Sequence, residues 1–123
     1  MTLSDLDNME LYRSDQASWD VDVGTDMTGA TVYFAVYATF PQGTIDDDTT
    51  ALIYKDTDDG VVFTDASEGQ FTITIESADT EDWEFSGDKV HYVYGLEYQL
   101  AGQTYRISIG RGVFVIYKDV VRT

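Results

Sequence analysis

The sequence predicts an all-β protein, an antiparallel sandwich of two sheets built from seven or eight short strands. Three observations lead to this fold class. Apolar residues recur with a period of two, as in strands with one buried face, and helical spacing is nearly absent. Segments rich in Gly, Asp, Thr and Ser separate the alternating runs, as turns do. The 123 residues, 43% of them hydrophobic, suffice for one domain with its own core.

The first half of the chain contains one long strand candidate, residues 31–40, and short ones at residues 19–23, 51–55 and 61–64. Alternate side chains of the long candidate form an expected core face: Val32, Phe34, Val36 and Ala38. Its other face carries Tyr33, Ala35 and Tyr37. Residues 71–76 alternate in the same way, with three apolar side chains expected to point inward: Phe71, Ile73 and Ile75.

The second half begins with the only helical candidate, residues 77–85, where we expect Ser77 to cap a single turn and Trp83 to close one end of the sandwich. Residues 89–99 then form a strand with four large side chains on one face: Tyr92, Tyr94, Leu96 and Tyr98. Ala101 and Gly102 offer a tight turn into a partner strand at residues 104–109. A last strand, residues 113–117, follows Gly110-Arg111-Gly112, which we interpret as a bulge or bend.

The chain is strongly acidic, with a net charge of −16 from 17 Asp and 6 Glu against 7 basic residues, only 3 of them Lys. This charge disfavours binding to phosphate backbones, so nucleic acid is an unsuitable partner. Abundant aspartate with little lysine is typical of proteins kept soluble in concentrated salt, where charge repulsion is screened. The alternative is an ordinary acidic, loop-rich protein. No apolar run is long enough to span a membrane, and residues 1–10 lack the features of a signal peptide.

The charge is unevenly distributed along the chain. Residues 1–88 hold 21 acids and only Arg13 and Lys55, whereas residues 89–123 hold five basic residues against Glu97 and Asp119. Since like charges across an interface are costly, we expect the C-terminal strands to pack against another subunit. The candidate interface residues are Arg106, Arg111, Lys118, Arg122, Tyr105 and Tyr117. The alternative is that these are central strands with little exposed surface.

Catalytic constellations are missing from the sequence. The one histidine, His91, lies inside a predicted strand, and the chain has no cysteine, so Ser-His-Asp and Cys-His arrangements have little support. Gly110-Arg111-Gly112 lacks the context of a phosphate-binding loop. No carboxylate pair stands among apolar neighbours that would raise one pKa. We therefore expect no enzymatic activity and no cofactor.

Two aspartate clusters are weak candidates for calcium, which takes its oxygen ligands from flexible loops. The six residues are Asp46, Asp47, Asp48, Asp56, Asp58 and Asp59. The segment DTDDG at residues 56–60 departs from the EF-hand pattern because its glycine comes one position early and no glutamate ends the loop. Solvated loop acid is the alternative.

The nine tyrosines permit three readings. Seven of them lie in predicted strands: Tyr33, Tyr37, Tyr92, Tyr94, Tyr98, Tyr105 and Tyr117. Aromatic pairs across strands stabilise sheets, which explains most of them. Some could instead anchor a protein partner or form a stacking platform for sugars.

Four segments follow one another along the chain: LYRSDQASWDVDV, DMTGATVYFAVYAT, GQFTITIESADTEDW and HYVYGLEYQLAGQTYRISIGRGVFVIYKDVVR. In this order they resemble the immunoglobulin-like domain of structural proteins in tailed phages, such as the N-terminal domain of the baseplate upper protein. The most specific matches are Met27-Thr28-Gly29, Gly69-Gln70-Phe71, Ala78-Asp79-Thr80, Gly102, Gly110 and Asp119-Val120-Val121-Arg122. The resemblance covers residues 11–122.

This resemblance implies an immunoglobulin-like sandwich at residues 11–123, preceded by an N-terminal arm at residues 1–10. It also implies a non-enzymatic virion protein of the tail, baseplate or capsid surface, whose partners are other structural proteins and copies of itself. The localisation it implies is the virion. The alternative is a carbohydrate-binding sandwich that recognises host glycans with exposed aromatic rings.

Overall fold

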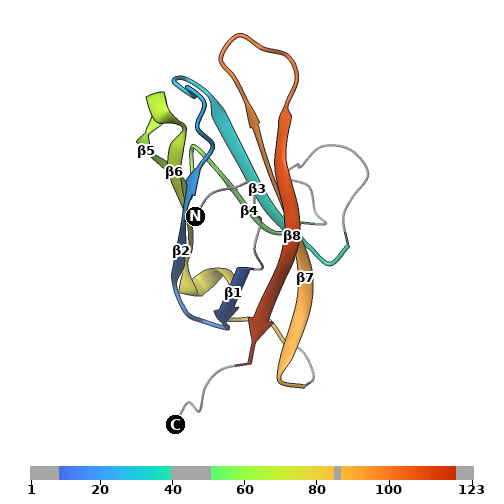
Figure 1. The fold of residues 1–123 in the computed structure, drawn as a ribbon. Helices are drawn as coiled ribbons and strands as arrows, with labels where there is room; N and C mark the ends of the chain where they lie inside the picture. Colours follow the sequence, from blue (N-terminus) through green and yellow to red (C-terminus); the bar gives the residue numbers. More distant parts are fainter. Residues whose placement is uncertain (1–8, 40–50, 85–86, 119–123) are drawn as a thin grey trace.

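Eight strands and two short 3-10 helices make up the described part of the chain, residues 9–39, 51–84 and 87–118 of a computed structural model (Figure 1). The elements are β1 (Met9–Tyr12), β2 (Ala17–Asp22), β3 (Thr31–Tyr37), β4 (Ala51–Asp56), β5 (Val61–Asp65), η1 (Ala66–Glu68), β6 (Gln70–Ile75), η2 (Ser77–Asp79), β7 (Lys89–Gln99) and β8 (Ile107–Tyr117). The predicted all-β class and the predicted number of strands are confirmed.

The strands form two facing layers (Figure 1). One sheet has five strands in the order β1-β8-β7-β3-β4, and the other has three in the order β2-β6-β5. The neighbouring strands are antiparallel with one exception, β1, which runs parallel to β8 with Met9 opposite Phe114. The sheet is therefore mixed rather than purely antiparallel as predicted. A parallel edge strand needs a long connection, and here the rest of the sandwich separates β1 from β8.

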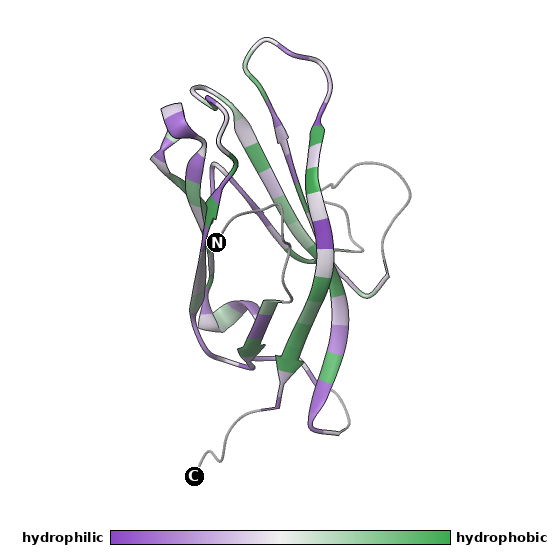
Figure 2. Ribbon diagram, in the orientation of Figure 1, coloured by the Kyte–Doolittle hydropathy of each residue, from purple (hydrophilic) through white to green (hydrophobic). Residues whose placement is uncertain are grey.

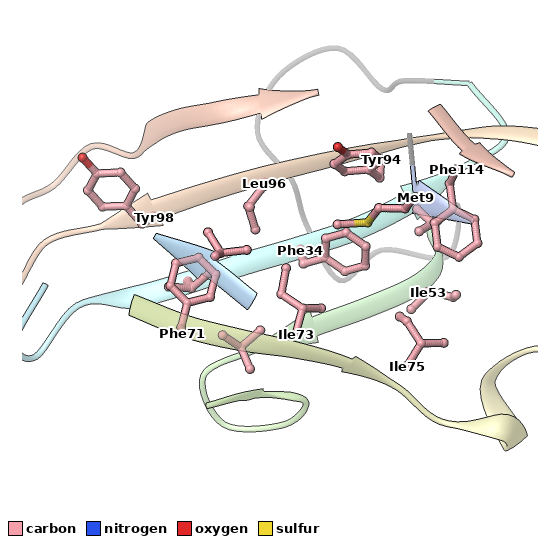
Figure 3. Packing of buried hydrophobic residues seen from close by; sticks show 14 of the residues in the cluster. Met9, Phe34, Ile53, Phe71, Ile73, Ile75, Tyr94, Leu96, Tyr98 and Phe114 are labelled. Carbon is pink, nitrogen blue, oxygen red and sulfur yellow. The ribbon is translucent and has the colours of Figure 1, made fainter. Parts of the chain in front are cut away.

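The core fills the space between the two sheets (Figure 3). β6 alternates as predicted, because Phe71, Ile73 and Ile75 are fully buried. The four inward residues predicted for β7 also join the core cluster. In β3 the prediction fails at its end: the strand stops at Tyr37, so Ala38 is exposed instead of part of the core.

The C-terminal hairpin differs in two details from the prediction. β8 starts at Ile107, later than expected, and continues through the glycines to Tyr117, so the two predicted strands are one. The register shifts at Ile109, where Leu96 faces Gly110 but Glu97 faces Ser108. The irregularity thus precedes the Gly110–Gly112 tripeptide.

Gly112 has a separate steric role in β8. A Cβ atom at Gly112 would come within 2.6 Å of the Tyr94 ring. Tyr94 is fully buried and packs against Phe34, with ring centroids 5.9 Å apart. Because glycine has no Cβ atom, it leaves room for the large Tyr94 ring in the core.

The connection between the sheets after β6 holds the predicted helical turn, in a shorter form. η2 is a single 3-10 turn, and Glu76 rather than Ser77 occupies its N-cap position. The backbone N–H of Glu76 donates to Asp79 Oδ2 at 2.8 Å. Trp83 packs against the core as expected, edge-on to Tyr92 with a centroid distance of 5.5 Å.

The N-terminal boundary also lies earlier than predicted. Met9 is fully buried in the core and Glu10 follows it in β1, so both residues belong to the sandwich and not to an arm. Residues 1–8 lie outside the described residues.

Candidate interaction face

The outward side of the five-stranded sheet is the most distinctive surface in the described part of the chain. Because side chains alternate in a strand, the positions opposite one another in neighbouring strands share a face. The pairings place Tyr12 beside Tyr117, and Tyr33, Ala35 and Tyr37 on β3 beside Glu97, Gly95 and Val93 on β7. We call this surface the tyrosine face. Its tyrosines are Tyr12, Tyr33, Tyr37, Tyr54 and Tyr117, and its aliphatic residues include Ala35, Val93, Val113 and Val115.

The tyrosine face carries a second hydrophobic cluster outside the core between the sheets. Ala35 and Tyr37 are 0% and 1% exposed although they point away from that core. Tyr33, Tyr54, Ala51 and Val93 are half-buried around them. Figure 2 shows that most of the C-terminal half of β8 is coloured hydrophobic, although its residues alternate between the two faces of the sheet. Both faces of this part of the sheet are therefore apolar.

Three cations lie on the tyrosine face, two of them against tyrosine rings. The Arg106 guanidinium stands 3.7 Å from the centre of the Tyr33 ring and 3.5 Å from Glu97 Oε1. The Lys89 ammonium lies 5.9 Å from the centre of the Tyr117 ring. Such cation–π contacts favour a fixed position of the charged group. Arg111 is exposed and stands opposite Gly95.

The acids on this face interact with groups of the face itself. Glu97 pairs with Arg106, and the Tyr117 hydroxyl donates to Glu10 Oε1 at 3.2 Å. Desolvation and this bond to Glu10 raise the pKa of Tyr117. Desolvation and the charge of Asp56 raise the pKa of Tyr54 strongly. The carboxylates of the tyrosine face are thus engaged by its own residues.

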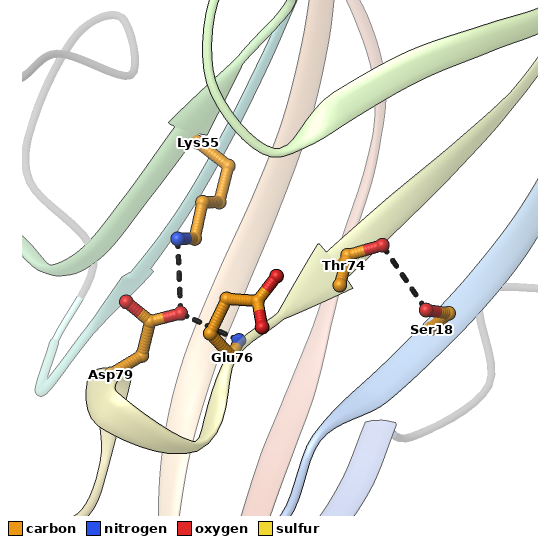
Figure 4. A network of polar contacts seen from close by, with 5 residues as sticks. All are labelled: Ser18, Lys55, Thr74, Glu76 and Asp79. Carbon is orange, nitrogen blue, oxygen red and sulfur yellow. Dashed lines mark hydrogen bonds and ion pairs between the residues drawn. The ribbon is translucent and has the colours of Figure 1, made fainter.

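The outward side of the three-stranded sheet has a different composition. Its residues are mostly small and polar, and we call it the acidic face: Ser18, Asp20, Asp22, Val62, Thr64, Gln70, Thr72 and Thr74. Hydrogen bonds join them across the strands, from Thr72 to Asp20 at 2.9 Å and between Ser18 and Thr74 at 3.1 Å. Figure 4 shows the bond between Ser18 and Thr74. The three strands contain three aspartates and no Lys or Arg.

The structure brings some of the predicted interface residues together. Arg106, Arg111 and Tyr117 lie on the tyrosine face. Tyr105 is 57% exposed in the loop between β7 and β8. Lys118 is exposed just beyond β8, and its backbone N–H donates to the Asp88 carbonyl oxygen at 2.7 Å. Arg122 lies outside the described residues.

The aspartates named as calcium candidates do not gather into a site in the described ranges. Asp56 Oδ1 accepts hydrogen bonds from the backbone N–H groups of Asp58 and Asp59, at 2.9 and 3.1 Å. This is a carboxylate that closes a tight turn, while the side chains of Asp58 and Asp59 are exposed. In residues 9–39, 51–84 and 87–118, no three His, Cys, Asp or Glu side chains could hold one metal ion. Asp46, Asp47 and Asp48 lie outside these ranges.

His91 lies on β7 opposite Val115, exposed on the tyrosine face. The sequence reading placed it in a strand, which is confirmed. Its cross-strand neighbour is aliphatic, so this pairing supplies no acid to orient the imidazole.

Sequence reasoning gave no role to the two cations of the acidic first 88 residues, and the structure gives each one a partner near η2. Lys55 is buried, and its ammonium lies 2.9 Å from Asp79 Oδ2 (Figure 4). The Arg13 guanidinium donates to the Trp83 carbonyl oxygen at 2.7 Å. Both contacts attach the connection after β6 to elements at the edges of the five-stranded sheet. The signal in the sequence is that Arg13 and Lys55 are the only basic residues among 21 acids in residues 1–88. A cation with so many acids around it has many possible partners, so the sequence favours an ion pair for it without naming the partner.

No family model matches the chain, and no curated protein matches it. In the described part of the chain, neither helix has the length and apolar character needed to cross a membrane.

Proposed function

We propose that this protein is a non-enzymatic structural protein of a tailed-virus particle, which assembles by protein–protein contacts through the tyrosine face. The observation that carries the proposal is the composition of that face. In a chain of net charge −16, it gathers five tyrosines, a row of valines and three of the seven basic residues. Tyrosine and arginine are the side chains that most often anchor protein interfaces.

The strand order supports an immunoglobulin-like sandwich. Immunoglobulin domains place their second, fourth and fifth main strands in one sheet and their third, sixth and seventh in the other. Here β2, β5 and β6 share one sheet, and β3, β7 and β8 share the other. β4 lies beside β3, where variable-type domains insert an extra strand. This order of strands supports the immunoglobulin-like sandwich that the resemblance to the phage domain implies.

The charge distribution supports assembly on one side of the molecule. Acidic side chains outside the tyrosine face repel a second acidic protein. The carboxylates of the tyrosine face itself are engaged by Arg106 and by tyrosine hydroxyls. Another acidic protein can therefore approach this protein most easily at the tyrosine face. The remaining acidic surface keeps the assembled copies apart from others and in solution.

The geometry does not favour a glycan platform. Such a platform needs exposed rings in a row on one face. Among the described tyrosines, Tyr12 and Tyr105 are the exposed ones, and they lie at opposite ends of the β7–β8 hairpin. Tyr33 is covered by Arg106, and Tyr37 is 1% exposed.

The virion assignment is tested on particles. Purified virus particles from the source culture should contain the protein by mass spectrometry after a salt wash, and gold-labelled antibodies should mark one defined part of the particle. Absence of the protein from washed particles that retain their other structural proteins would overturn the assignment.

We also propose that the protein is adapted to concentrated salt, and this has its own measurement. If the excess of aspartate is an adaptation to salt, repulsion destabilises the fold in dilute buffer and molar KCl screens it, with a Debye length of about 3 Å. The midpoint of thermal unfolding should then rise between dilute buffer and molar KCl. A midpoint that is unchanged or falls would remove halophily and leave an ordinary acidic protein.

A further inference from the structure

We infer that β1 exchanges between two copies of this chain, so that β1 of each copy completes the five-stranded sheet of the other. The binding site is the edge of β8 at residues 114–117, and the segment that fits it is β1 itself. This contact uses an edge of the sheet and not its outward face, so it goes beyond the proposed function and does not depend on it.

The edge of β8 needs a strand beside it. Phe114 and Ile116 point into the core and are fully buried. Their neighbours across the pair are Met9 and Leu11 of β1, which are 0% and 5% exposed. Figure 3 shows Met9 next to the Phe114 ring. Without β1, these apolar side chains and a row of backbone N–H and C=O groups would face water.

β1 can leave this edge without breaking any other strand pair. It has four residues and lies at the margin of the five-stranded sheet (Figure 1). In the described part of the chain its only strand neighbour is β8, and β8 remains paired with β7 along its whole length when β1 is absent. β1 is therefore a separable piece of the sheet.

The turn that follows β1 is strained while β1 stays in its own copy. The N–H group of Asp15 donates to the Tyr12 carbonyl oxygen at 3.1 Å, which closes a four-residue turn. Its third residue, Ser14, has a φ of 72°, and among the described residues every other positive φ belongs to a glycine. A Cβ atom disfavours this region, and glycine is the usual residue there in type II turns. Opening the turn lets Ser14 adopt an ordinary backbone conformation.

A second copy is the partner because its β1 matches this edge group by group. The exchanged strand again buries Met9 and Leu11. It again places the Arg13 N–H group at hydrogen-bonding distance from the Tyr117 carbonyl oxygen, as in the single chain, where the distance is 2.9 Å. The pairing of β1 with β8 is thus the same in both arrangements, while the strain in the turn is relieved in both copies. Since two molecules become one, a higher protein concentration favours the exchanged pair.

The length of the linker makes the exchange reciprocal. Residues 13–16 connect β1 to β2, and four extended residues span about 14 Å at most. The two copies must therefore lie side by side at their β8 edges. Once one β1 has crossed, the other β1 is held close to the remaining empty edge, so the pair closes into a dimer instead of growing as a chain.

The first test uses the absence of cysteine from the chain. In the double variant Tyr12→Cys/Tyr117→Cys, the two introduced thiols lie opposite one another across β1 and β8, as a disulfide requires. Oxidation joins two chains when β1 is exchanged and closes a loop in one chain when it is not. The control is Lys89→Cys/Tyr117→Cys, which shares one site and joins β7 to β8 within a single hairpin. Denaturing gels without reductant separate these products.

The samples are prepared so that exchange can reach equilibrium. Because β1 must detach before it can cross, each protein is partly unfolded in urea and refolded at the concentration to be measured. Thermal unfolding establishes that each variant folds. If Tyr12→Cys/Tyr117→Cys does not fold, Glu10→Cys/Val115→Cys replaces it, since these two residues are also opposite one another in β1 and β8.

A second set of variants tests the turn. Ser14→Gly accepts the positive φ and should lower the association constant of the dimer about tenfold. Ser14→Val opposes the positive φ with its branched Cβ atom and should raise the constant about tenfold. Ser18→Val makes the same substitution at an exposed position of β2 and should leave the constant unchanged. Sedimentation velocity over a concentration series measures all four proteins.

The inference predicts a covalent dimer from Tyr12→Cys/Tyr117→Cys, and single chains from the control, at concentrations where the wild type is dimeric. It is overturned if the wild type stays monomeric at every concentration after refolding. It is also overturned if the dimers carry their disulfides within one chain, or if both cysteine pairs give covalent dimers, because the copies then meet through another surface. In each of these cases the protein's presence in washed particles still tests the virion assignment separately.

Discussion

The two sheets of this sandwich have inner faces of the same kind and outer faces of opposite kinds. On the three-stranded sheet, the outward positions are serine, threonine and aspartate, joined by hydrogen bonds such as that from Thr72 to Asp20. On the five-stranded sheet, the outward positions form a second apolar cluster in which Ala35 and Tyr37 are buried. The three-stranded sheet therefore has a polar outer face, whereas the five-stranded sheet has an apolar, tyrosine-rich outer face of the composition common in protein interfaces.

The largest expected effect on stability comes from truncating an outward residue on each sheet and comparing the two. Tyr37→Ala should destabilise the protein by about 3 kcal/mol, because it removes a ring that is 1% exposed. Val62→Ala, at a position 64% exposed on the acidic face, should change stability by about 0.5 kcal/mol or less. Urea unfolding measures both. Equal effects would show that the outer faces are energetically alike.

A smaller effect is expected at the ion pair that joins the sheets. Asp79→Ala should cost about 2 kcal/mol, because it leaves the buried ammonium of Lys55 without its carboxylate and removes the acceptor of the Glu76 N–H group. The Lys55→Met variant has no buried ammonium that could lose its carboxylate. Asp79→Ala should therefore lower the free energy of unfolding less in this variant than in the wild type. Urea unfolding of the four proteins gives the coupling energy. Additive effects would mean that the pair does not stabilise the fold.

High pH should weaken the tyrosine face selectively. The pKa of Tyr54 lies above its ordinary value of 10.0, because burial and Asp56 disfavour the phenolate. The stabilisation is present in full below that value and is lost as the pH rises, since the unfolded chain releases the proton first. Between about pH 10 and 12, the wild type should lose more stability than Tyr54→Phe. Tyr105→Phe, in the exposed loop, should keep the wild-type dependence, and parallel curves for all three would contradict the assignment.

The smallest effect is expected in the turn before β3, which belongs to neither face. The Thr28 hydroxyl and N–H donate to Asp26 Oδ1 at 2.7 and 3.0 Å and hold the pKa of Asp26 below its ordinary value of 3.8. The stabilisation is present above that value and is lost as the pH falls through the lowered pKa. The stability difference between the wild type and Asp26→Ala should therefore shrink in acid. A difference that stays constant down to about pH 2 would show that the charged form is not favoured.

The inner layer of the sandwich was predictable, because burial on one side of a strand imposes a period of two on the sequence. Phe71, Ile73 and Ile75 in β6 show this in its simplest form, and β7 matches its predicted bounds. The pattern does not say where a strand stops, so Ala38 was wrongly placed in the core. It also could not show that β8 runs through Gly110 to Gly112 as one strand, since glycine usually ends such a run.

Part of the candidate face was also predictable from the sequence. Charge asymmetry along the chain identified Arg106 and Arg111, which the structure places on one surface. The same reasoning missed Tyr12, Tyr33 and Tyr54 as members of that surface, because β1, β3 and β4 come from the acidic part of the chain. Only pairing between strands distant in the sequence assembles these residues.

The sequence by itself determined the fold class, most strands and the residues between the sheets, because each depends on local alternation and turn chemistry. The tertiary structure alone decided that β1 joins β8 in parallel, that Lys55 meets Asp79, and that the tyrosines of four strands form one face. These features depend on which strands become neighbours. Alternation specifies an inside and an outside for every strand, but it carries no information about the strand that lies next to it.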